Sequence, residues 1–309
     1  MVQREPASGK RLIHPQARIE DHEHESQRIR RAIIKLTDAC QFACVHCANT
    51  DGEGKLATTD LETIEQILTR FNPAEVEFTG GEPLTRQKLL LAAVAAARKR
   101  SDFVMINTNM ELLDEQKLIE LEKAGLTHIH FAVLALDPEL HRAIRGKPFA
   151  DIEKVKHNIE AVLEKTNLKV IAEFVPMKQN LHEFPAVYRY IGDLRKKHGE
   201  RIVELEVGRL IPMGRAVNQL APPLDEQFEV LESIGRPEYP VEVFCFGAKG
   251  TKRLANAGFV PYLCDAGEGM FYFNIDGSVL ADNFSGVPMA KDFRSFRVSQ
   301  RPPMHCPFR

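Results

Sequence analysis

The sequence has no long apolar segment and little net charge. None of its uninterrupted apolar stretches is long enough to span a bilayer, and Met1 to Glu5 lack the apolar core of a signal peptide. The formal net charge over 309 residues is only -2, so nothing indicates a nucleic-acid binder held by phosphate contacts. We therefore expect a cytoplasmic protein that binds neither membrane nor nucleic acid.

Six cysteines are present, and in the cytoplasm they favour metal ligands or reactive thiols over disulfides. Cys40, Cys44 and Cys47 form a Cys-x3-Cys-x2-Cys run. Three thiolates would leave one iron of a four-iron cubane open, and an open iron can bind and reduce a small molecule. A zinc ion is the alternative, but it needs a fourth ligand, and His46 lies awkwardly inside the loop.

Strand and helix patterns alternate through most of the chain, which favours an α/β fold with right-handed crossovers and a parallel sheet. Six such units are fewer than the eight of a closed TIM barrel, so we expect a partial (βα)6 barrel. Residues 1–28 are expected to form a polar N-terminal arm, 29–220 the barrel core, and 221–309 a small β-rich appendage. Strands are expected at residues 32–36, 76–78, 104–106, 128–133, 169–175 and 203–207, and helices at 59–71, 89–100, 112–124, 152–162 and 181–198.

A Gly80-Gly81-Glu82-Pro83 turn follows the second expected strand. The two glycines permit a close backbone approach that a side chain would forbid, so their amides and carbonyls can meet the polar end of a ligand. Such a turn is common, so by itself it is weak evidence of a ligand site. Its position one βα unit after the cysteine loop makes the combination specific.

These features together resemble the radical S-adenosylmethionine (SAM) superfamily, over about residues 31–218. The resemblance implies that Cys40, Cys44 and Cys47 bind three irons of a [4Fe-4S] cluster and that SAM chelates the fourth. Reductive cleavage of SAM would then give methionine and a 5'-deoxyadenosyl radical, with an electron donor such as flavodoxin or ferredoxin. Glu82 and Pro83 would fix the turn that holds the SAM amino group.

The same resemblance suggests further cofactor contacts. His46 stands where relatives usually carry a flat side chain near adenine; the less favoured alternative is a solvated loop histidine. Asn109 would shape the SAM pocket, unless Asn107 to Asn109 is only an Asn-rich turn. Glu173 could bind the SAM ribose or pair with an arginine. Ile211 belongs to a segment that passes near adenine in relatives.

Two other segments bear on the resemblance. Ala135 replaces a serine that is common in relatives after the fourth strand, which puts a polar SAM contact there in doubt. The following segment, His141 to Gly146, resembles one whose basic residues often face the active-site mouth.

The C-terminal part resembles a degenerate SPASM or twitch domain. Residues 273–279 are expected to form a hairpin with an Asp-Gly turn, and Asp282 stands at its second cysteine position. Cys264, Cys306 and Cys245, with Asp282 or substrate, could hold a second [4Fe-4S] cluster. Alternatively that cluster is lost and the thiols are buried as small apolar residues. In a third interpretation, Cys245 returns a hydrogen atom to a substrate radical, as an epimerase requires.

We therefore expect a radical SAM enzyme that abstracts a substrate hydrogen. The substrate would be a natural-product sugar, another small molecule or a peptide, and the outcome oxidation, epimerisation or bond formation. The alternative is a non-catalytic barrel protein that binds zinc or a closed cluster.

Overall fold

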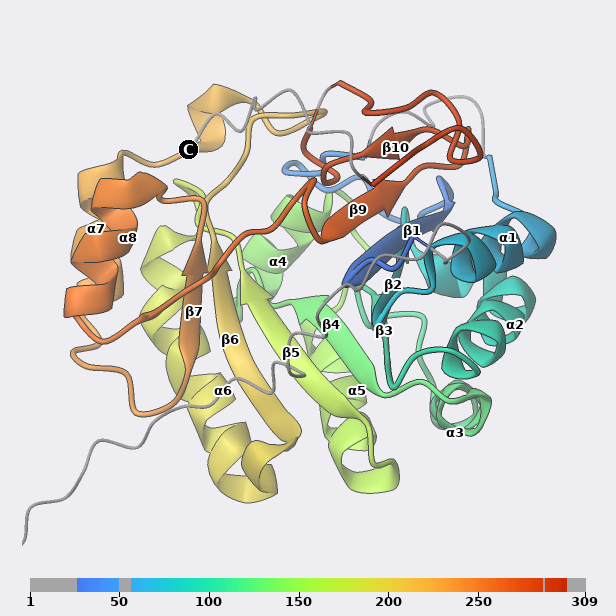
Figure 1. The fold of residues 1–309 in the computed structure, drawn as a ribbon. Helices are drawn as coiled ribbons and strands as arrows, with labels where there is room; N and C mark the ends of the chain where they lie inside the picture. The colour runs from blue at the N-terminus through green and yellow to red at the C-terminus, as the bar shows by residue number, and fades with distance from the viewer. Residues whose placement is uncertain (1–26, 50–56, 286, 299–309) are drawn as a thin grey trace, which may run out of the picture.

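A computed structural model describes residues 27–49, 57–285 and 287–298 of the chain (Figure 1). One ten-stranded sheet runs through it in the order β10-β9-β1-β2-β3-β4-β5-β6-β7-β8. Every neighbouring pair is parallel except β9 and β10. The six expected strands are confirmed as β1 (Arg31–Thr37), β2 (Glu75–Gly80), β3 (Phe103–Asn107), β4 (His128–Ala132), β5 (Lys169–Phe174) and β6 (Ile202–Gly208).

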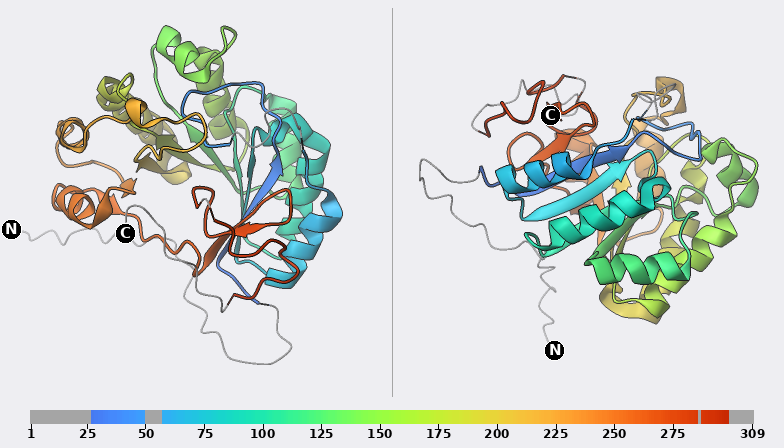
Figure 2. Two further views of the ribbon diagram at one scale, coloured as in Figure 1. Left: turned by 90° about the horizontal axis from the view of Figure 1, so that it is seen from above. Right: turned by 90° about the vertical axis from the view of Figure 1, so that its right-hand side faces the viewer.

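Helices cover the outer face of this sheet, as a chain of parallel crossovers requires (Figures 1 and 2). The expected helices are present, and one further helix, α4, was not predicted. Their bounds are α1 (Leu61–Phe71), α2 (Gln87–Arg98), α3 (Glu115–Ala124), α4 (Pro138–Arg145), α5 (Ile152–Lys165) and α6 (Phe184–His198), with 3-10 turns at Pro83–Arg86, Leu181–Glu183, Gly199–Arg201 and Asn218–Leu220.

The start of α1 shows how side chains fix an element. Asp60 is the N-cap of this helix, and its side chain accepts a hydrogen bond from the Thr63 amide. Thr59, just before the cap, donates its hydroxyl to the Lys35 carbonyl oxygen, 3.0 Å away. The apolar face expected for this helix is buried at Ile64, Leu68 and Phe71, among others.

The residues after 220 extend both edges of the sheet. They also contain two helices, which the expected β-rich pattern did not include. The β9–β10 hairpin is confirmed, with Gly277 at φ 85° in its turn. A separate domain at 221–309 stays a prediction. The elements are α7 (Leu224–Glu232), β7 (Val241–Phe244), α8 (Gly247–Asn256), β8 (Val260–Pro261), β9 (Met270–Phe273) and β10 (Val279–Leu280).

Aromatic side chains join this C-terminal part to the core. The Phe71 ring of α1 lies 5.1 Å from Phe273 of β9 and 5.9 Å from Phe296, and Phe296 packs edge-on against Phe271. All four rings are almost fully buried. Because such rings bury large apolar areas, β9 contributes to the same core as α1.

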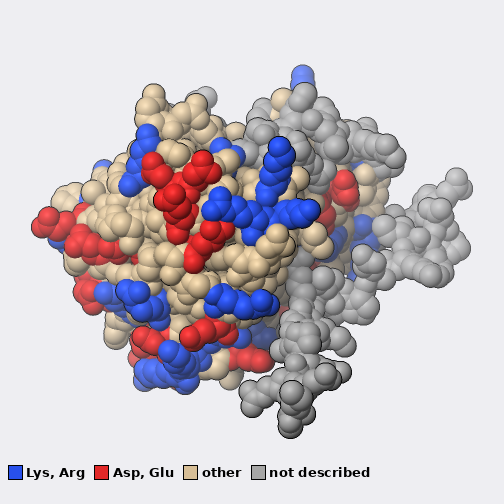
Figure 3. Space-filling view, turned by 90° about the vertical axis from the view of Figure 1, so that its left-hand side faces the viewer, with Lys and Arg blue, Asp and Glu red and all other residues tan. Residues whose placement is uncertain are grey.

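Surface charge is mixed on the face shown in Figure 3, where Lys and Arg side chains lie among Asp and Glu. This agrees with the small net charge of the chain. In the described ranges, no helix combines the length and apolar character that crossing a membrane requires.

Candidate active site

The three cysteines of the Cys-x3-Cys-x2-Cys run lie in the loop that follows β1, at the carboxyl edge of the parallel strands. Cys40 is exposed, whereas Cys44 and Cys47 are half-buried. Their sulfur atoms do not all lie within 4.8 Å of one another. Three thiolates on one tetrahedral zinc ion would lie about 3.8 Å apart, given Zn–S bonds of about 2.3 Å. The three sulfur atoms therefore do not form a ready-made site for a single zinc ion in this structure.

The unpredicted helix α4 holds one side of this loop. The amides of Ala43 and Val45 donate to the carbonyl oxygens of Arg145 and Ile144, at 3.1 Å and 3.0 Å. Figure 2 shows the segment after β1 beside α4. The segment noted in the sequence for its basic residues thus fixes the backbone of the cysteine loop.

The segment after β6 holds the other side. Arg215 donates its amide to the Cys47 carbonyl oxygen at 2.9 Å and its Nε to the Cys44 carbonyl oxygen at 3.0 Å. Ile211, a predicted cofactor contact, is half-buried four residues earlier in this same segment.

A buried cation beside the thiols fits an anionic group at this loop. Arg145 is only 5% exposed, and its Nη1 lies 3.8 Å from the Cys44 sulfur. Nη2 donates to the Ala132 carbonyl oxygen, while Nε has no partner, and no carboxylate pairs with Arg145 among the described residues. Because an unpaired buried charge is costly, a cluster with three thiolates is a suitable counter-charge.

Protonation of the thiols is coupled to metal binding. Burial raises the pKa of the half-buried Cys47. This group is therefore a thiol at neutral pH until a metal displaces its proton.

The glycine turn after β2 lies directly against the start of the cysteine loop. The Gly81 amide donates to the Thr37 carbonyl oxygen at 2.6 Å, and the Glu82 amide donates to the Ala39 carbonyl oxygen at 2.8 Å. A Cβ atom on Gly81 would lie 2.4 Å from the Ala39 carbonyl oxygen. These two amides therefore bind the protein itself and are not available to a ligand.

Glu82 connects this turn to the loop after β3. The carboxylate is 1% exposed and accepts hydrogen bonds from the Leu84 amide, the Thr108 hydroxyl and the Asn109 amide, at 3.1, 2.9 and 2.7 Å. Burial outweighs these bonds and raises the pKa of Glu82 to about 7. Pro83, directly after it, begins the 3-10 turn.

Asn109 connects the loop after β3 to the cysteine loop and to the glycine turn. Its Oδ1 accepts from Gln41 Nε2 of the cysteine loop at 2.9 Å, while its amide binds Glu82. The sequence suggested Asn109 and Glu82 but not Gln41 or Thr108, because their roles depend on which loops meet at the sheet edge.

His46 lies between two arginines of the site. Burial and the charges of Arg145 and Arg215 lower the pKa of His46 to about 3, so the imidazole is neutral. Its Nδ1 is buried without a hydrogen-bond partner among the described residues. The half-buried His46 is not a fully solvated loop histidine, and its contact with adenine stays a prediction.

Glu173 lies on β5 in a group of charged strand residues. Glu173 is opposite Glu206 in the sheet register, and Glu206 Oε2 lies 3.2 Å from His130 Nε2. Burial raises the pKa of Glu173, and the positive charge acting on it comes from His130 rather than from an arginine. Glu77 accepts from Asn107 Nδ2 at 2.7 Å on the same side.

The predicted C-terminal residues are not brought together as a ligand set among the described residues. Cys245 follows β7, is half-buried and has φ 66°, an unusual backbone angle for a side chain with a Cβ. Cys264 is exposed, and Asp282 uses Oδ1 to accept the Phe284 amide at 2.9 Å. Cys306 lies outside the described residues. The second cluster and the hydrogen-donor role of Cys245 stay predictions.

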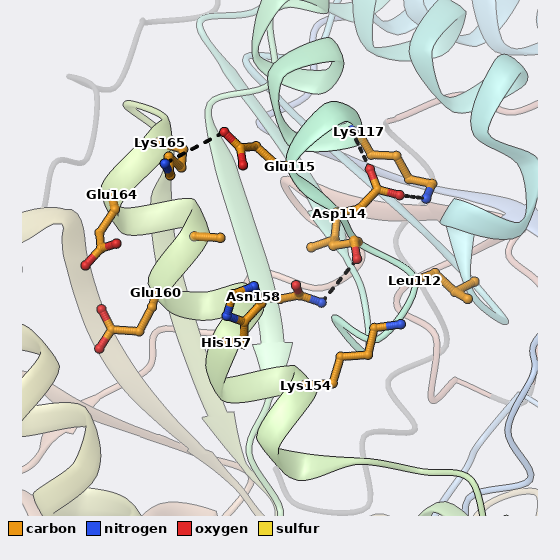
Figure 4. Close-up of a pocket in the computed structure, with 12 residues that line it drawn as sticks. Leu112, Asp114, Glu115, Lys117, Lys154, His157, Asn158, Glu160, Glu164 and Lys165 are labelled. Carbon is orange, nitrogen blue, oxygen red and sulfur yellow. Dashed lines mark hydrogen bonds and ion pairs between the residues drawn. The ribbon is translucent and has the colours of Figure 1, made fainter.

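Away from this edge, a pocket lies between α3 and α5 in the helix layer (Figure 4). Charged side chains line it, including an ion pair between Lys165 and Glu115 at 3.8 Å. None of the predicted site residues lines this pocket.

Sequence comparison identifies the family. The model of the radical SAM superfamily matches residues 34–191, which include the cysteine loop and the glycine turn. A probable GTP 3',8-cyclase of Methanocaldococcus jannaschii is 24% identical over 172 residues, covering 54% of this chain and 57% of that protein. A PqqA peptide cyclase of Bradyrhizobium diazoefficiens is 27% identical over 166 residues, covering 52% and 43%. The chain therefore spans about half the length of these curated relatives.

Solved structures share the fold. Streptococcus suis SuiB bound to S-adenosylmethionine matches with a TM-score of 0.61 at 18% identity, over 84% of this chain and 62% of that chain. The anSMEcpe protein with bound AdoMet and the Cp18Cys peptide matches with a TM-score of 0.59 at 15% identity, over 84% and 75%. The chain belongs to the radical SAM superfamily, whose cofactors are a [4Fe-4S] cluster and S-adenosylmethionine.

Proposed function

We propose that this radical SAM enzyme abstracts a hydrogen atom from a peptide or a small molecule bound near the carboxyl edge of the sheet. The proposal is carried by the hydrogen bonds that connect the cysteine loop to the glycine turn at Glu82 and to the loop after β3 at Asn109. A [4Fe-4S] cluster held by Cys40, Cys44 and Cys47 would supply the electron for reductive cleavage of SAM.

The chain's own residues would divide the remaining work. Cys40, Cys44 and Cys47 would hold the cluster, and the buried guanidinium of Arg145 would balance its negative charge. The SAM amino group is a hydrogen-bond donor, so carbonyl oxygens of Gly80 and Gly81 suit it, because the Gly81 amide is already bonded within the protein.

Other predicted contacts would shape the rest of the cofactor pocket. The neutral ring of His46 and the apolar side chain of Ile211 suit adenine, and Glu173 suits a ribose hydroxyl. Asn109 would act by holding Gln41 and Glu82 in place.

For the substrate, names of related proteins support two classes. One relative is a PqqA peptide cyclase, and solved neighbours are bound to the precursor peptide SuiA or to the Cp18Cys peptide. Another relative is a probable GTP 3',8-cyclase. We favour a peptide, with a small molecule as the second choice, and oxidation, bond formation or epimerisation as the outcome.

Anaerobic reconstitution tests the radical chemistry. The wild-type protein should give a [4Fe-4S] spectrum that changes on addition of SAM, and dithionite should then produce 5'-deoxyadenosine. Replacement of Cys40, Cys44 and Cys47 by Ala should abolish the SAM-dependent spectral change and the 5'-deoxyadenosine, because no thiolate of the cysteine loop is left to hold an iron. His157→Gln, at an exposed position on α5, is the control.

Two results would overturn the proposal. One is a reconstituted wild-type cluster whose spectrum is indifferent to SAM and yields no 5'-deoxyadenosine. The other is undiminished product from the triple alanine variant.

A further inference from the structure

Two different elements support the cysteine loop. On one side, carbonyl oxygens at the end of α4 accept the amides of Ala43 and Val45, which we call the α4-bound amides. On the other side, Asn109 Oδ1, in the loop after β3, accepts Gln41 Nε2 at 2.9 Å. The buried residue Glu111 contacts both α4 and Asn109, so it links the two supports.

The side chain of Glu111 binds two helices. Glu111 is 5% exposed, and its Oε1 lies 3.2 Å from Nε2 of His141 on α4. Its Oε2 accepts the amide of Asp151, the N-cap of α5, at 3.1 Å. The Glu111 amide donates to Asn109 Oδ1 at 3.1 Å, the same oxygen that Gln41 binds. The carboxylate therefore fixes where α4 and α5 lie relative to Asn109.

His141 transmits this contact to the cysteine loop. It is 1% exposed, and it lies one helical turn before Ile144 and Arg145, whose carbonyl oxygens hold the α4-bound amides. Its Nδ1 has no hydrogen-bond partner in the described ranges, so the bond to Glu111 is the polar contact of the ring. A buried polar pair is costly to separate, because each group would be left unsatisfied.

The backbone beside Glu111 is held in an unusual conformation. Met110 is fully buried and has φ 72°, in the left-handed region that a residue with a Cβ rarely adopts. Its carbonyl oxygen accepts Nδ2 of the buried Asn158 at 2.7 Å, and its amide donates to the Thr108 hydroxyl at 3.1 Å. Such a conformation persists where the surrounding structure imposes it, so this loop is built to hold Asn109 in one place.

We propose that Glu111 is a positioning residue that couples the support of the cysteine loop by α4 to its support by Asn109. Glu111 acts through His141 and Asn109 rather than by touching the reacting atoms. The inference rests on the proposed function, in which this loop holds the cluster that reduces SAM. Loss of Glu111 should loosen both supports, whereas loss of His141 should loosen α4 alone.

Hydrogen–deuterium exchange of the metal-free protein tests this coupling without using activity. In Glu111→Ala, the α4-bound amides and the Asn109 amide should exchange at least about tenfold faster than in the wild type, because local opening becomes easier. In His141→Ala, the α4-bound amides alone should exchange faster, since Glu111 still binds Asn109 and the Asn109 amide keeps its bond to Glu82.

Val162→Ala is the matched control for a general loss of stability. This side chain is fully buried on α5, about three turns after Asp151. The variant should change the exchange of the α4-bound amides and of the Asn109 amide by less than about threefold, because these amides exchange by local opening.

Glu111→Gln tests whether hydrogen bonds carry the effect. Glutamine keeps an oxygen that can accept the Asp151 amide and an NH2 group that can donate to His141 Nε2. With dithionite, the reconstituted Glu111→Ala variant should form 5'-deoxyadenosine at least about tenfold more slowly than the wild type, and Glu111→Gln within about threefold of it, because small displacements of reacting groups are costly. If the proposed function fails, the wild type forms no 5'-deoxyadenosine, while the exchange rates still decide the positioning role.

Either of two results refutes the positioning role. One is an unchanged exchange rate of the Asn109 amide in Glu111→Ala. The other is equal acceleration of the α4-bound amides in Glu111→Ala and Val162→Ala. If Glu111→Ala does not fold, His141→Ala decides, because wild-type exchange of the α4-bound amides in that variant would show that the buried pair does not hold α4.

Discussion

At the residue scale, charged side chains of this site act through partners distant in sequence. Glu82 is surrounded by donors from its own turn and from the loop after β3, and Arg145 is buried beside a cysteine about a hundred residues earlier. The Glu82 carboxylate finds three hydrogen-bond donors within the protein, and the charge of Arg145 also acts on it. Arg145 forms no ion pair with a carboxylate among the described residues, so an anion at the loop would stabilise it.

His130 allows a prediction about pH and stability. Burial alone would lower its pKa, but the hydrogen bond to Glu206 and the charges of Glu206, Glu173 and Glu77 raise the pKa of His130 to about 9. The folded state binds the proton more tightly than the unfolded state, in which the histidine pKa is about 6.5. Protonation of His130 therefore stabilises the fold fully below about pH 6.5, and this stabilisation is lost as the pH rises through 9. The free energy of unfolding in urea, measured on the metal-free protein, should fall between pH 6.5 and 9.5 by about 1–3 kcal/mol more in the wild type than in His130→Gln.

The matched control for this experiment is His157→Gln, at an exposed position on α5. It should retain the wild-type dependence on pH. Parallel stability curves for the wild type and His130→Gln would show that the strand carboxylates do not hold the proton on His130.

At the element scale, the sequence predicted the strands and most helices well. Apolar periodicity identified them because each buries one face against its neighbours. It missed α7, α8 and also α4, whose start and end carry local signals: Asp137 is the N-cap, Pro138 lies in the first turn and Gly146 is the C-cap. The hydrogen bonds from α4 to the cysteine loop could not be predicted, because the two segments are far apart in the sequence.

The parts of the site that consist of neighbouring residues in the sequence were predictable. The cysteine run and the glycine turn are motifs of consecutive residues. The contributions of Gln41, Thr108 and Arg215 depend instead on loops that meet only after the sheet forms. The residues of one loop do not show which other loop will lie beside it, so these partners could not be predicted from the sequence.

The contact between the glycine turn and the cysteine loop gives the prediction at this scale. In Gly81→Ala, the new Cβ would lie 2.4 Å from the Ala39 carbonyl oxygen and 2.5 Å from the Asp38 carbonyl oxygen, so the backbone of the loop must shift. We expect unfolding in urea to be easier by about 1–3 kcal/mol. Iron bound after reconstitution should fall below about half of the wild-type amount, since displaced thiols no longer match the cluster.

A glycine elsewhere provides the control. In Gly192→Ala, within α6, the new Cβ would lie 3.2 Å from a ring carbon of Tyr239, and alanine favours a helix. That variant should keep its stability and its iron. Wild-type stability together with full iron content in Gly81→Ala would refute the steric argument.

At the scale of the whole molecule, the C-terminal residues complete the sheet that carries the site. β9 pairs with β1 on the side opposite β2, so the strand that leads into the cysteine loop is flanked on both sides. Arg30, just before β1, forms ion pairs with Glu75 at 2.8 Å and with Asp265 of the segment before β9. The strand beneath the cysteines therefore depends on residues more than 200 positions later.

This dependence predicts the result of cutting the chain at residue 220, where the sequence suggested a domain boundary. Without β9, the edge of β1 would be unpaired and the buried Phe71 would lose Phe273 and Phe296. We expect a chain of residues 1–220 to aggregate or to melt without a cooperative transition, because an exposed apolar strand edge invites association. The measurements are size-exclusion chromatography and thermal unfolding by circular dichroism.

Single substitutions in the full chain test the same packing without removing residues. Phe296→Ala empties a fully buried site between Phe71 and Phe271 and should lower the free energy of unfolding by about 3–5 kcal/mol. Leu263→Ala, at a side chain that is 71% exposed, should change it by less than about 0.5 kcal/mol. If residues 1–220 instead purify as a monomer with a sharp cooperative melt, the core folds alone. The aromatic contacts to β9 would then join two separable domains, because a unit that melts cooperatively by itself has its own sufficient core.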